Sequence, residues 1–310
     1  MVRWMMSEGP SNRVIFLVLQ LACRARGVKL RAYPTYLALR KGKREMRLAL
    51  HHFTYSVDMS SRFDIYYPVV EPHDEGGYQV VDYSSPRLQR YSGSGMEFEL
   101  ASFPEEQEAI EDYFRWYTPG PGDLVFDVGA HCGVSSFEFS RRVGPTGRVI
   151  ALEPDPTNFA LLRRNVQRHN LTNVTLLQVA LSDSNGTASF NAEGTIGSGL
   201  LSVFDRPTTG AQIEVETATL EDLCKRYSVP NFCKIDIEGA EIEVLRQAGG
   251  FLACTPMQMV FDTHHFVRGV QTTAETENML RQAGYQVFSS AETGTTATWA
   301  KPGAVGVEAG

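Results

Sequence analysis

The sequence predicts an α/β protein: a mainly parallel sheet with one antiparallel edge strand, preceded by a smaller β-rich subdomain. From residue 123 onward, short apolar runs alternate with segments of helical periodicity, as expected for strands joined by crossover helices. The first run, Leu124 to Val128, leads into a glycine turn and a helix, and open α/β sheets bind ligands at that end of a strand. Before residue 100, β-like runs are instead separated by turns. We therefore expect a subdomain at 1–102 and the main domain at 103–310.

Seven apolar runs are long enough to form the strands of the main sheet. The glycine turn opens a helix that ends at 144–147, and Asp155-Pro156 offers an N-cap and a first helical residue for the next one. Thr219 begins a third helix with a capping-box pattern. Residues 186–217 resemble a hairpin over the site, and further helices are expected at 240–248 and 275–283. The predicted strands are 124–128, 148–153, 173–179, 232–237, 257–263, 285–288 and 295–300, the last two forming a hairpin.

The first hundred residues follow a different pattern. Residues 1–30 favour a helix, and a second helix is expected at 103–117, just before the turn at 118–122. Between these helices, turn residues such as Gly76-Gly77 separate short runs with β propensity. The predicted strands of this subdomain are 35–39, 45–50, 63–70, 78–83 and 96–100.

Charge and cysteine content narrow the classes of function. The chain has a formal net charge of -7, which argues against a nucleic-acid partner, but residues 1–60 carry eleven Lys or Arg against three Asp or Glu. This basic end indicates either a solvated face, which we favour, or a weak contact with a membrane surface or an anionic substrate. The run Val14–Cys23 is too short to span a bilayer and fits a docked or interfacial helix. Five cysteines without Cys-x-x-Cys spacing indicate a reducing, cytoplasmic setting.

Acidic residues follow the ends of the first four predicted strands of the main sheet. Glu153 is positioned to accept both hydroxyls of a ribose, and Asp183 is expected to accept from an adenine amino group. Together with Asp127 and Asp236, these acids would repel a pyrophosphate and attract a ligand that carries a sulfonium and an ammonium group. The charge pattern therefore favours S-adenosyl-L-methionine over NAD or ATP.

The glycine turn supports the same choice of cofactor. Its pattern is Gly129-x-x-x-Gly133, and the second glycine of a dinucleotide fingerprint is replaced by His131. Ala130 lies between them, and the backbone of this turn is expected to contact the cofactor.

The stretch 234–241 and the end of the fifth strand carry the candidate catalytic residues. Lys234, Asp236 and Glu238 alternate along one side of a strand, so a buried Lys234 needs a carboxylate partner. His264 is the expected general base, because an imidazole can be neutral near pH 7, while Asp236 is expected to position the acceptor and Glu238 is the other candidate. Asp236, Glu238, Asp262 and His264 carry metal-ligand atoms, but no recognised ligand spacing supports a metal and we expect none.

These motifs resemble those of the FkbM-type S-adenosylmethionine-dependent methyltransferases. The resemblance rests on Asp127-Val-Gly-Ala-x-x-Gly133, Glu153-Pro-Asp, Ala180-Leu-Ser-Asp183, Thr219-Leu-Glu-Asp-Leu223 and Lys234-Ile-Asp-Ile-Glu-Gly-Ala-Glu241. It runs from about Phe103 to Trp299, and His131 stands where the family often has Asn. It implies a seven-stranded Rossmann-like fold and, commonly, O-methylation of sugars or natural products.

The sequence therefore predicts an S-adenosyl-L-methionine-dependent methyltransferase that acts on a hydroxyl of a sugar or natural-product small molecule. Two other classes remain open. One is a non-catalytic binding protein that keeps the cofactor fold, which would bind the cofactor without turnover. The other is a nicotinamide-dependent oxidoreductase, which would require tight NAD binding.

Overall fold

The computed structural model describes four stretches of the chain and divides it into two compact units. The described residues are 10–105, 107–203, 210–290 and 297–303. One unit contains residues 1–107 and 194–196, and the other contains 108–193 and 197–310.

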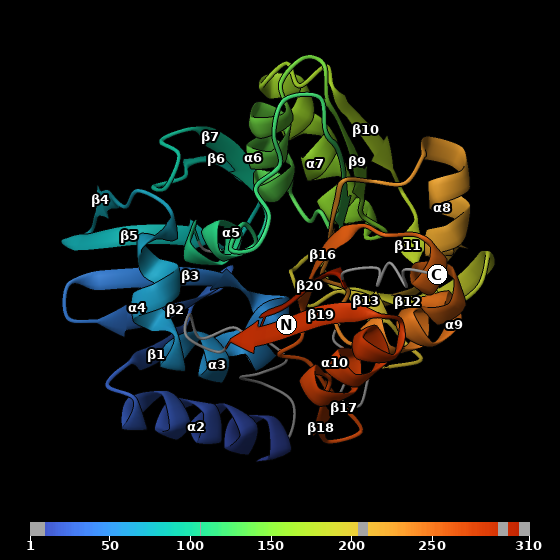
Figure 1. Cartoon of the computed structure of the whole chain (residues 1–310). Helices are drawn as coiled ribbons and strands as arrows, with labels where there is room; N and C mark the ends of the chain where they lie inside the picture. The colour runs from blue at the N-terminus through green and yellow to red at the C-terminus, as the bar shows by residue number, and fades with distance from the viewer. Residues whose placement is uncertain (1–9, 106, 204–209, 291–296, 304–310) are drawn as a thin grey trace, which may run out of the picture. The chain divides into compact units, whose positions relative to one another are not determined.

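The larger unit is organised around one seven-stranded sheet with the order β10-β9-β8-β15-β16-β20-β19 (Figure 1). The strands from β10 to β16 are parallel, and β20 is antiparallel to both of its neighbours. This confirms the predicted seven-stranded, mainly parallel α/β sheet. The strands are β8 (Leu124–Val128), β9 (Arg148–Leu152), β10 (Val174–Leu177), β15 (Phe232–Ile235), β16 (Gln258–Asp262), β19 (Tyr285–Ser290) and β20 (Ala297–Pro302).

The antiparallel strand differs from the expectation in its position. It was expected at the edge of the sheet, but β20 lies one place inside, between β16 and β19. The predicted hairpin is present, and its second strand inserts beside β16. The apolar face of β20 includes Trp299, which is 1% exposed, so burial favours the inner place for this strand. Residues 295 and 296 of the predicted strand lie outside the described residues.

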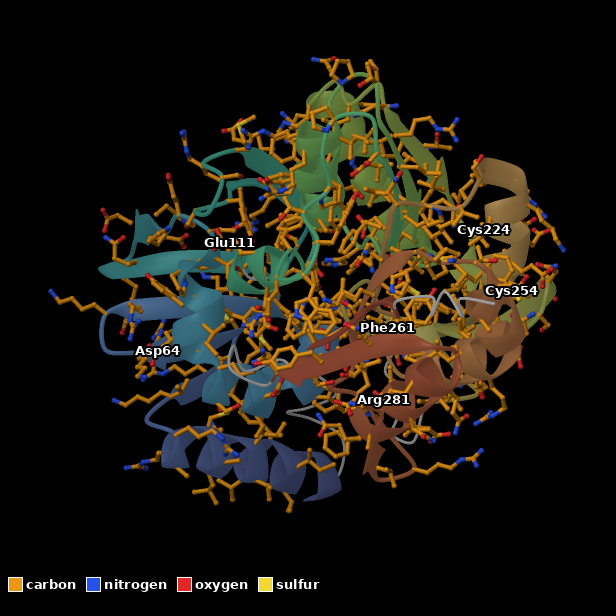
Figure 2. All side chains as sticks on the ribbon, viewed as in Figure 1. Asp64, Glu111, Cys224, Cys254, Phe261 and Arg281 are labelled. Carbon is orange, nitrogen blue, oxygen red and sulfur yellow. The ribbon has the colours of Figure 1, made fainter. Side chains whose placement is uncertain are left out.

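Helices cover both faces of the sheet. One face carries α8 (Leu220–Tyr227), α9 (Glu241–Cys254) and α10 (Thr273–Gln282), which form a large apolar core with β8, β9, β15 and β16. Phe261 and Cys224, labelled in Figure 2, belong to this core. The opposite face packs against α6 (Val134–Val143) and α7 (Pro156–Arg168), where Ala130, Ala151 and Leu162 form a smaller core. Because side chains alternate along each strand, Asp127 and Lys234 point to the face of α6 and α7.

The helix starts follow the predicted caps. Asp155 accepts hydrogen bonds from the backbone N–H groups of Thr157 and Asn158 at the start of α7, with Pro156 as the first helical residue. The Thr219 side chain accepts from the N–H of Asp222 at the start of α8. The expected helix at 103–117 is shorter in the structure and forms α5 (Gln107–Asp112).

A second, four-stranded sheet of the larger unit has the order β11-β14-β12-β13. It contains the hairpin predicted within 186–217, of which residues 204–209 lie outside the described residues. Its strands are β11 (Ala180–Leu181), β12 (Gly186–Ala192), β13 (Gly199–Leu200) and β14 (Ala211–Ala218), and a short hairpin is formed by β17 (Phe266–Val267) and β18 (Val270–Gln271).

The smaller unit is β-rich, as predicted, and begins with the helix α2 (Pro10–Ala25). A five-stranded sheet has the order β1-β2-β3-β5-β4, and β6 pairs with β7. The strands are β1 (Lys29–Ala32), β2 (Tyr36–Lys41), β3 (Arg44–Ala49), β4 (His73–Glu75), β5 (Tyr78–Tyr83), β6 (Arg87–Arg90) and β7 (Glu97–Leu100).

One predicted strand of this unit is wrong. Residues 63–70 form α4 (Phe63–Tyr66) and the 3-10 turn η2 (Tyr67–Val69), preceded by η1 (Leu50–Tyr55) and α3 (Ser56–Ser61). Phe63, Tyr66 and Tyr67 are buried and stand at positions i, i+3 and i+4, which is helical spacing. The aromatic content favoured a strand, but the spacing decides the local structure.

All five cysteines lie in the described part of the chain and are free thiols. Within that same part, no helix combines the length and apolar character needed to cross a bilayer.

Candidate functional site

The turn after β8 is held so tightly that only glycine fits at two of its positions. A Cβ on Gly129, whose φ is +76°, would lie 1.8 Å from the carbonyl oxygen of Asp236. A Cβ on Gly133, whose φ is +90°, would lie 2.6 Å from Leu162 Cδ1. The two glycines therefore let this turn pack against the end of β15 on one side and against α7 on the other.

Backbone groups of the turn make a defined set of hydrogen bonds. The N–H groups of Gly129 and Ala130 both donate to Leu152 O, at 3.0 and 2.9 Å, and the N–H of His131 donates to Glu153 Oε2 at 2.8 Å. His131 has a φ of +48°. His is among the non-glycine residues most often found in this left-handed region, so the turn accommodates a histidine at this position.

Glu153 is buried beside this turn and is bound through both carboxylate oxygens. Its Oε1 accepts from the N–H of Asp155 at 2.8 Å, and Glu153 is only 5% exposed. Burial, reinforced by the negative charge of Asp155, raises the pKa of Glu153 to about 8. Each oxygen keeps a second lone pair, so the carboxylate can also accept the hydroxyl groups of a ribose.

Asp155 is contacted by Ser198, just before β13 of the four-stranded sheet. Ser198 donates to Asp155 Oδ2 at 2.8 Å and accepts from the backbone N–H of Glu193 at 3.0 Å. Asn191, buried in turn, donates to Glu193 Oε1 at 2.7 Å. Asp155, which the sequence predicts as a helix cap, thus also contacts Ser198, just before β13.

Lys234 was expected to have a carboxylate partner, and in the structure it has two, Asp127 and Asp236. Lys234 and Asp127 are register partners on adjacent strands, and both side chains are fully buried. The ammonium lies 3.8 Å from Asp127 Oδ1 and 3.6 Å from Asp236 Oδ2, and it donates to Gly129 O at 2.8 Å. Asp127 also accepts from Ser135 and Ser136 at the start of α6. This network ties β8, β15, α6 and the glycine turn together at the predicted cofactor site.

Asp183 follows β11 of the four-stranded sheet. The strand β10 ends at Leu177, and residues 180–181 belong to the four-stranded sheet, so Asp183 does not follow the third strand of the main sheet directly. Its side chain is exposed and accepts from the hydroxyls of Ser182 and Ser184. No described contact joins it to Glu153 or to the glycine turn.

His264 forms a pair with Asp262 at the end of β16. Its Nδ1 lies 2.5 Å from Asp262 Oδ1, and 38% of the His264 side chain is exposed. Burial alone would lower the pKa of His264, but the charge of Asp262 outweighs it and the pKa is raised. Burial would likewise raise the pKa of Asp262, yet His264 holds it at about 2. His264 was expected to act as a base at its ordinary pKa; in the structure that pKa is raised, and Asp262 orients the ring.

The neighbouring His265 was missed by the sequence analysis, and it is this residue that lies among the acids of 236–241. Nε2 of His265 is 3.7 Å from Asp236 Oδ1 and 3.5 Å from Glu238 Oε1. On the other side of the ring, Nδ1 is 3.2 Å from Oε1 of the buried Glu241. Burial alone would lower the pKa of His265, but Glu241 and Glu238 raise it well above its usual value. The only signal in the sequence was the double histidine, which does not reveal which ring turns inward.

The methyltransferase FkbM domain family matches residues 127–287, just over half of the chain. The chain belongs to this family. The match begins at Asp127 and includes the glycine turn, Glu153 and the His265 region, so it covers the whole of the candidate site described above.

Two curated relatives have related sequences over part of their length. The 31-O-demethyl-FK506 methyltransferase FkbM of Streptomyces tacrolimicus is 30% identical over 155 residues, which are 40% of this chain and 59% of that protein. The hexuronic acid methyltransferase AglP of Haloferax volcanii is 29% identical over 173 residues, 52% of this chain and 68% of that protein. The similarity to the first relative thus spans about three fifths of that relative.

Among solved structures, methyltransferase FkbM from Methylobacillus flagellatus is similar with a TM-score of 0.45 and 19% sequence identity. The similarity covers 60% of this chain and 46% of that one. We base the fold assignment on the strand order of the seven-stranded sheet rather than on this similarity.

We expect Lys234→Met to reduce the free energy of unfolding by about 3–5 kcal/mol, because it leaves the buried Asp127 carboxylate without its cation. Urea denaturation followed by circular dichroism measures this change. Lys225→Met makes the same substitution at an exposed i,i+4 pair with Glu221 and should change stability little. Equal stability of the two variants would contradict the role assigned to Lys234.

Proposed function

We propose that this protein transfers the methyl group of S-adenosyl-L-methionine to a hydroxyl of a sugar or natural-product small molecule. The observation that carries the proposal is the glycine turn at the C-terminal end of β8, whose His131 N–H is bound to the buried Glu153. In this proposal Glu153 accepts the ribose hydroxyls, and the backbone from Gly129 to Gly133 lies along the methionine part of the cofactor. Membership of the FkbM domain family supports the same assignment.

The charges around the turn support this cofactor over a dinucleotide. Glu153 and Asp155 are buried acids within one short segment, and the backbone of Asp236 packs against Gly129 of the turn. A pyrophosphate would be repelled by these carboxylates, whereas a sulfonium and an ammonium would be attracted. In this proposal Asp183, in the segment after β11, accepts from the adenine amino group.

The acceptor is proposed from two lines of support. The two relatives are named for 31-O-demethyl-FK506 and for hexuronic acid, which are small molecules rather than nucleic acids. The net charge of -7 disfavours a polyanionic acceptor. A cytoplasmic location stays a prediction.

Methyl transfer to a hydroxyl also requires removal of a proton. The acceptor oxygen attacks the methyl carbon, the carbon–sulfur bond breaks, and its electron pair stays on sulfur. In this proposal the hydroxyl proton passes to Nε2 of His264, because Asp262 fixes Nδ1 as the donor nitrogen and leaves Nε2 with the lone pair. Asp236 then positions the acceptor between cofactor and base.

The proposal predicts a pH-dependent affinity for S-adenosylhomocysteine. Ribose hydroxyls bind the ionised form of Glu153 better, and its pKa is about 8, so the affinity should rise with pH. The ionised fraction of such a group increases by up to about 30-fold between pH 6.5 and 9. Isothermal titration calorimetry across this range measures the effect. The variant Glu153→Gln should bind more weakly at pH 9, by ~1.5–3 kcal/mol for each charge-assisted hydrogen bond that is lost.

The same variant serves as the control for the ligand's own amino group, because the pH dependence that remains in E153Q belongs to the ligand. A purely structural Glu153 would give the opposite result: a lower melting temperature with unchanged affinity and an unchanged pH profile. NAD(H) should show no measurable binding. NAD binding as tight as S-adenosylhomocysteine binding would favour the oxidoreductase, and cofactor binding without any methylated product would favour the non-catalytic binding protein.

We expect His264→Ala to lower turnover by ~10²–10⁴-fold, because the acceptor hydroxyl then lacks its base. The assay is methyl transfer from labelled S-adenosyl-L-methionine to acceptors in host extract, with products identified by mass spectrometry. The affinity for S-adenosylhomocysteine should stay nearly unchanged, since His264 is assigned to the acceptor side. Near-normal turnover of this variant would transfer the role of base to Asp236 or Glu238.

A further inference from the structure

Three potential metal ligands meet beyond the ends of β15 and β16. Asp236, Glu238 and His265 each contribute one ligand atom, and these atoms lie within 4.8 Å of one another. We call these three residues the His265 cluster. The distances from Nε2 of His265 to Asp236 and Glu238, 3.7 and 3.5 Å, exceed the 2.7–3.2 Å of an N–H···O hydrogen bond. They are close to the separations of neighbouring ligands around one shared cation.

The ring of His265 is buried and aimed into this cluster. Its side chain is 5% exposed, Nδ1 faces Glu241, and among the described residues Nε2 makes no hydrogen bond of normal geometry. A buried polar group without such a bond is costly, so its position calls for a ligand. The nearest group to Nδ1 is Glu241 Oε1 at 3.2 Å, and Nε2 faces the two carboxylates.

Glu241 contacts the other ring nitrogen of His265. A metal-binding histidine commonly directs its other ring nitrogen to a carboxylate, which fixes the ring orientation and raises the basicity of the ligand. Glu241 is fully buried and is itself fixed by the N–H of Ile237, which donates to its Oε1 at 3.1 Å. Glu241 therefore faces Nδ1 of His265, and Nε2 of the same ring faces the carboxylates of Asp236 and Glu238. This matches a carboxylate–histidine–metal arrangement.

The backbone of the cluster is also held in an unfavourable conformation. Glu238 has a φ of +57°, a left-handed conformation that is unfavourable for a non-glycine residue. Gly239 follows with a φ of +105° and packs against Val267. Strain of this kind gathers at ligand-binding sites, where the surrounding structure maintains it.

We propose that the His265 cluster binds a divalent metal ion of the first transition series through Asp236, Glu238 and Nε2 of His265. Two carboxylates and one imidazole suit Mn²⁺ better than Mg²⁺, which prefers oxygen ligands alone. A second group of potential ligands, Asp262, His264 and His265, is less suitable because Asp262 and His264 already bind each other. If the proposed methyl transfer holds, the ion would bind the acceptor hydroxyl and lower its pKa beside His264.

Metal binding is measured on the chelator-treated full-length protein with Mn²⁺ alone, by electron paramagnetic resonance and calorimetry. We expect one Mn²⁺ per chain. Binding should be lost in Glu238→Gln and His265→Asn and weakened by 10–100-fold in Glu241→Gln. Glu243→Gln is the matched control, because Glu243 stands on the same helix as Glu241, outside the cluster, and bonds to Ser202. Circular dichroism establishes that each variant is folded.

Two results would overturn this proposal: no saturable Mn²⁺ binding, or binding that survives E238Q in the folded protein. Loss of binding in Asp262→Asn with binding kept in E238Q would also overturn it, in favour of the other group of ligands. Since neither cofactor nor acceptor is present in this experiment, its outcome is independent of the proposed function. Mn²⁺ binding without any methylation would leave the metal site in place and reject the methyltransferase; methylation without Mn²⁺ binding would do the reverse.

A second, independent observation concerns the helix α2 of the smaller unit. The inner side of α2 contacts the rest of the smaller unit. Cys23 is fully buried and its thiol donates to Ser56 O, and Gln20 donates to Leu30 O. Its outer side is apolar as well. Of the twelve large apolar side chains that are exposed in the described part of the chain, five lie on this helix and are 49–57% exposed: Val14, Ile15, Leu17, Val18 and Leu21.

Basic residues border this apolar face. Arg24 follows Leu21 by three residues, so it lies at the border of the same face, and Arg26, Lys29 and Arg31 are exposed just beyond the helix. A helix of this length cannot span a bilayer, but an apolar face bordered by basic residues is suited to lie in the interface of an anionic membrane. We propose that α2 binds the surface of anionic lipid bilayers.

The test is flotation of the full-length protein with vesicles of phosphatidylcholine alone or with 30% phosphatidylserine added. We expect flotation only with phosphatidylserine, weakening as salt is raised. The double variant Val18→Asp/Leu21→Asp should abolish it, whereas Leu88→Asp, at an exposed residue of β6, should not. Absence of flotation, or flotation unaffected by V18D/L21D, would overturn the proposal. Self-association that V18D/L21D abolishes, without flotation, would assign the face to a second copy of the chain.

Discussion

The buried ammonium of Lys234 is the interaction on which the candidate site depends. A single cation lies among Asp127, Asp236 and the carbonyl of Gly129, and each belongs to a different structural element. A charge in this position is tolerated only because all of its neighbours are acceptors, so the neighbours must stay where they are. The amine thereby fixes the conformation of the glycine turn relative to β15.

The close contact of the turn with β15 couples the cofactor side to the acceptor side of the site. Gly129 approaches the carbonyl of Asp236 so closely that no side chain fits between them. The side chain of Asp236 faces Lys234 with one oxygen and His265 with the other. A displacement of the glycine turn would therefore move Asp236, and with it the group of residues assigned to the acceptor.

Sequence reasoning succeeded where one local pattern determines the structure. The strand β8, the cap at Asp155 and the carboxylate partner of Lys234 all follow from periodicity, capping chemistry or the cost of a buried charge. It failed where tertiary contacts decide. Residues 63–70 have strand-like composition but helical spacing. The inward orientation of His265 rather than His264 depends on Glu241, which is far from it in sequence. The chain leaves the main sheet after Leu177, which no local pattern indicates, so the sequence could not show that Asp183 follows β11 rather than a strand of the main sheet.

The balance of charge explains why the site as a whole favours a cationic ligand. Near the glycine turn and the ends of β15 and β16, acidic side chains outnumber basic ones. The acids are Asp127, Glu153, Asp155, Asp236, Glu238, Glu241 and Asp262. These surroundings favour the protonated forms: burial and Asp155 raise the pKa of Glu153 to about 8, and Glu241 and Glu238 raise that of His265 well above its usual value. A bound cation can replace those protons. In the two proposals made above, a sulfonium at the glycine turn and a metal ion at the His265 cluster would each place a cation among these carboxylates.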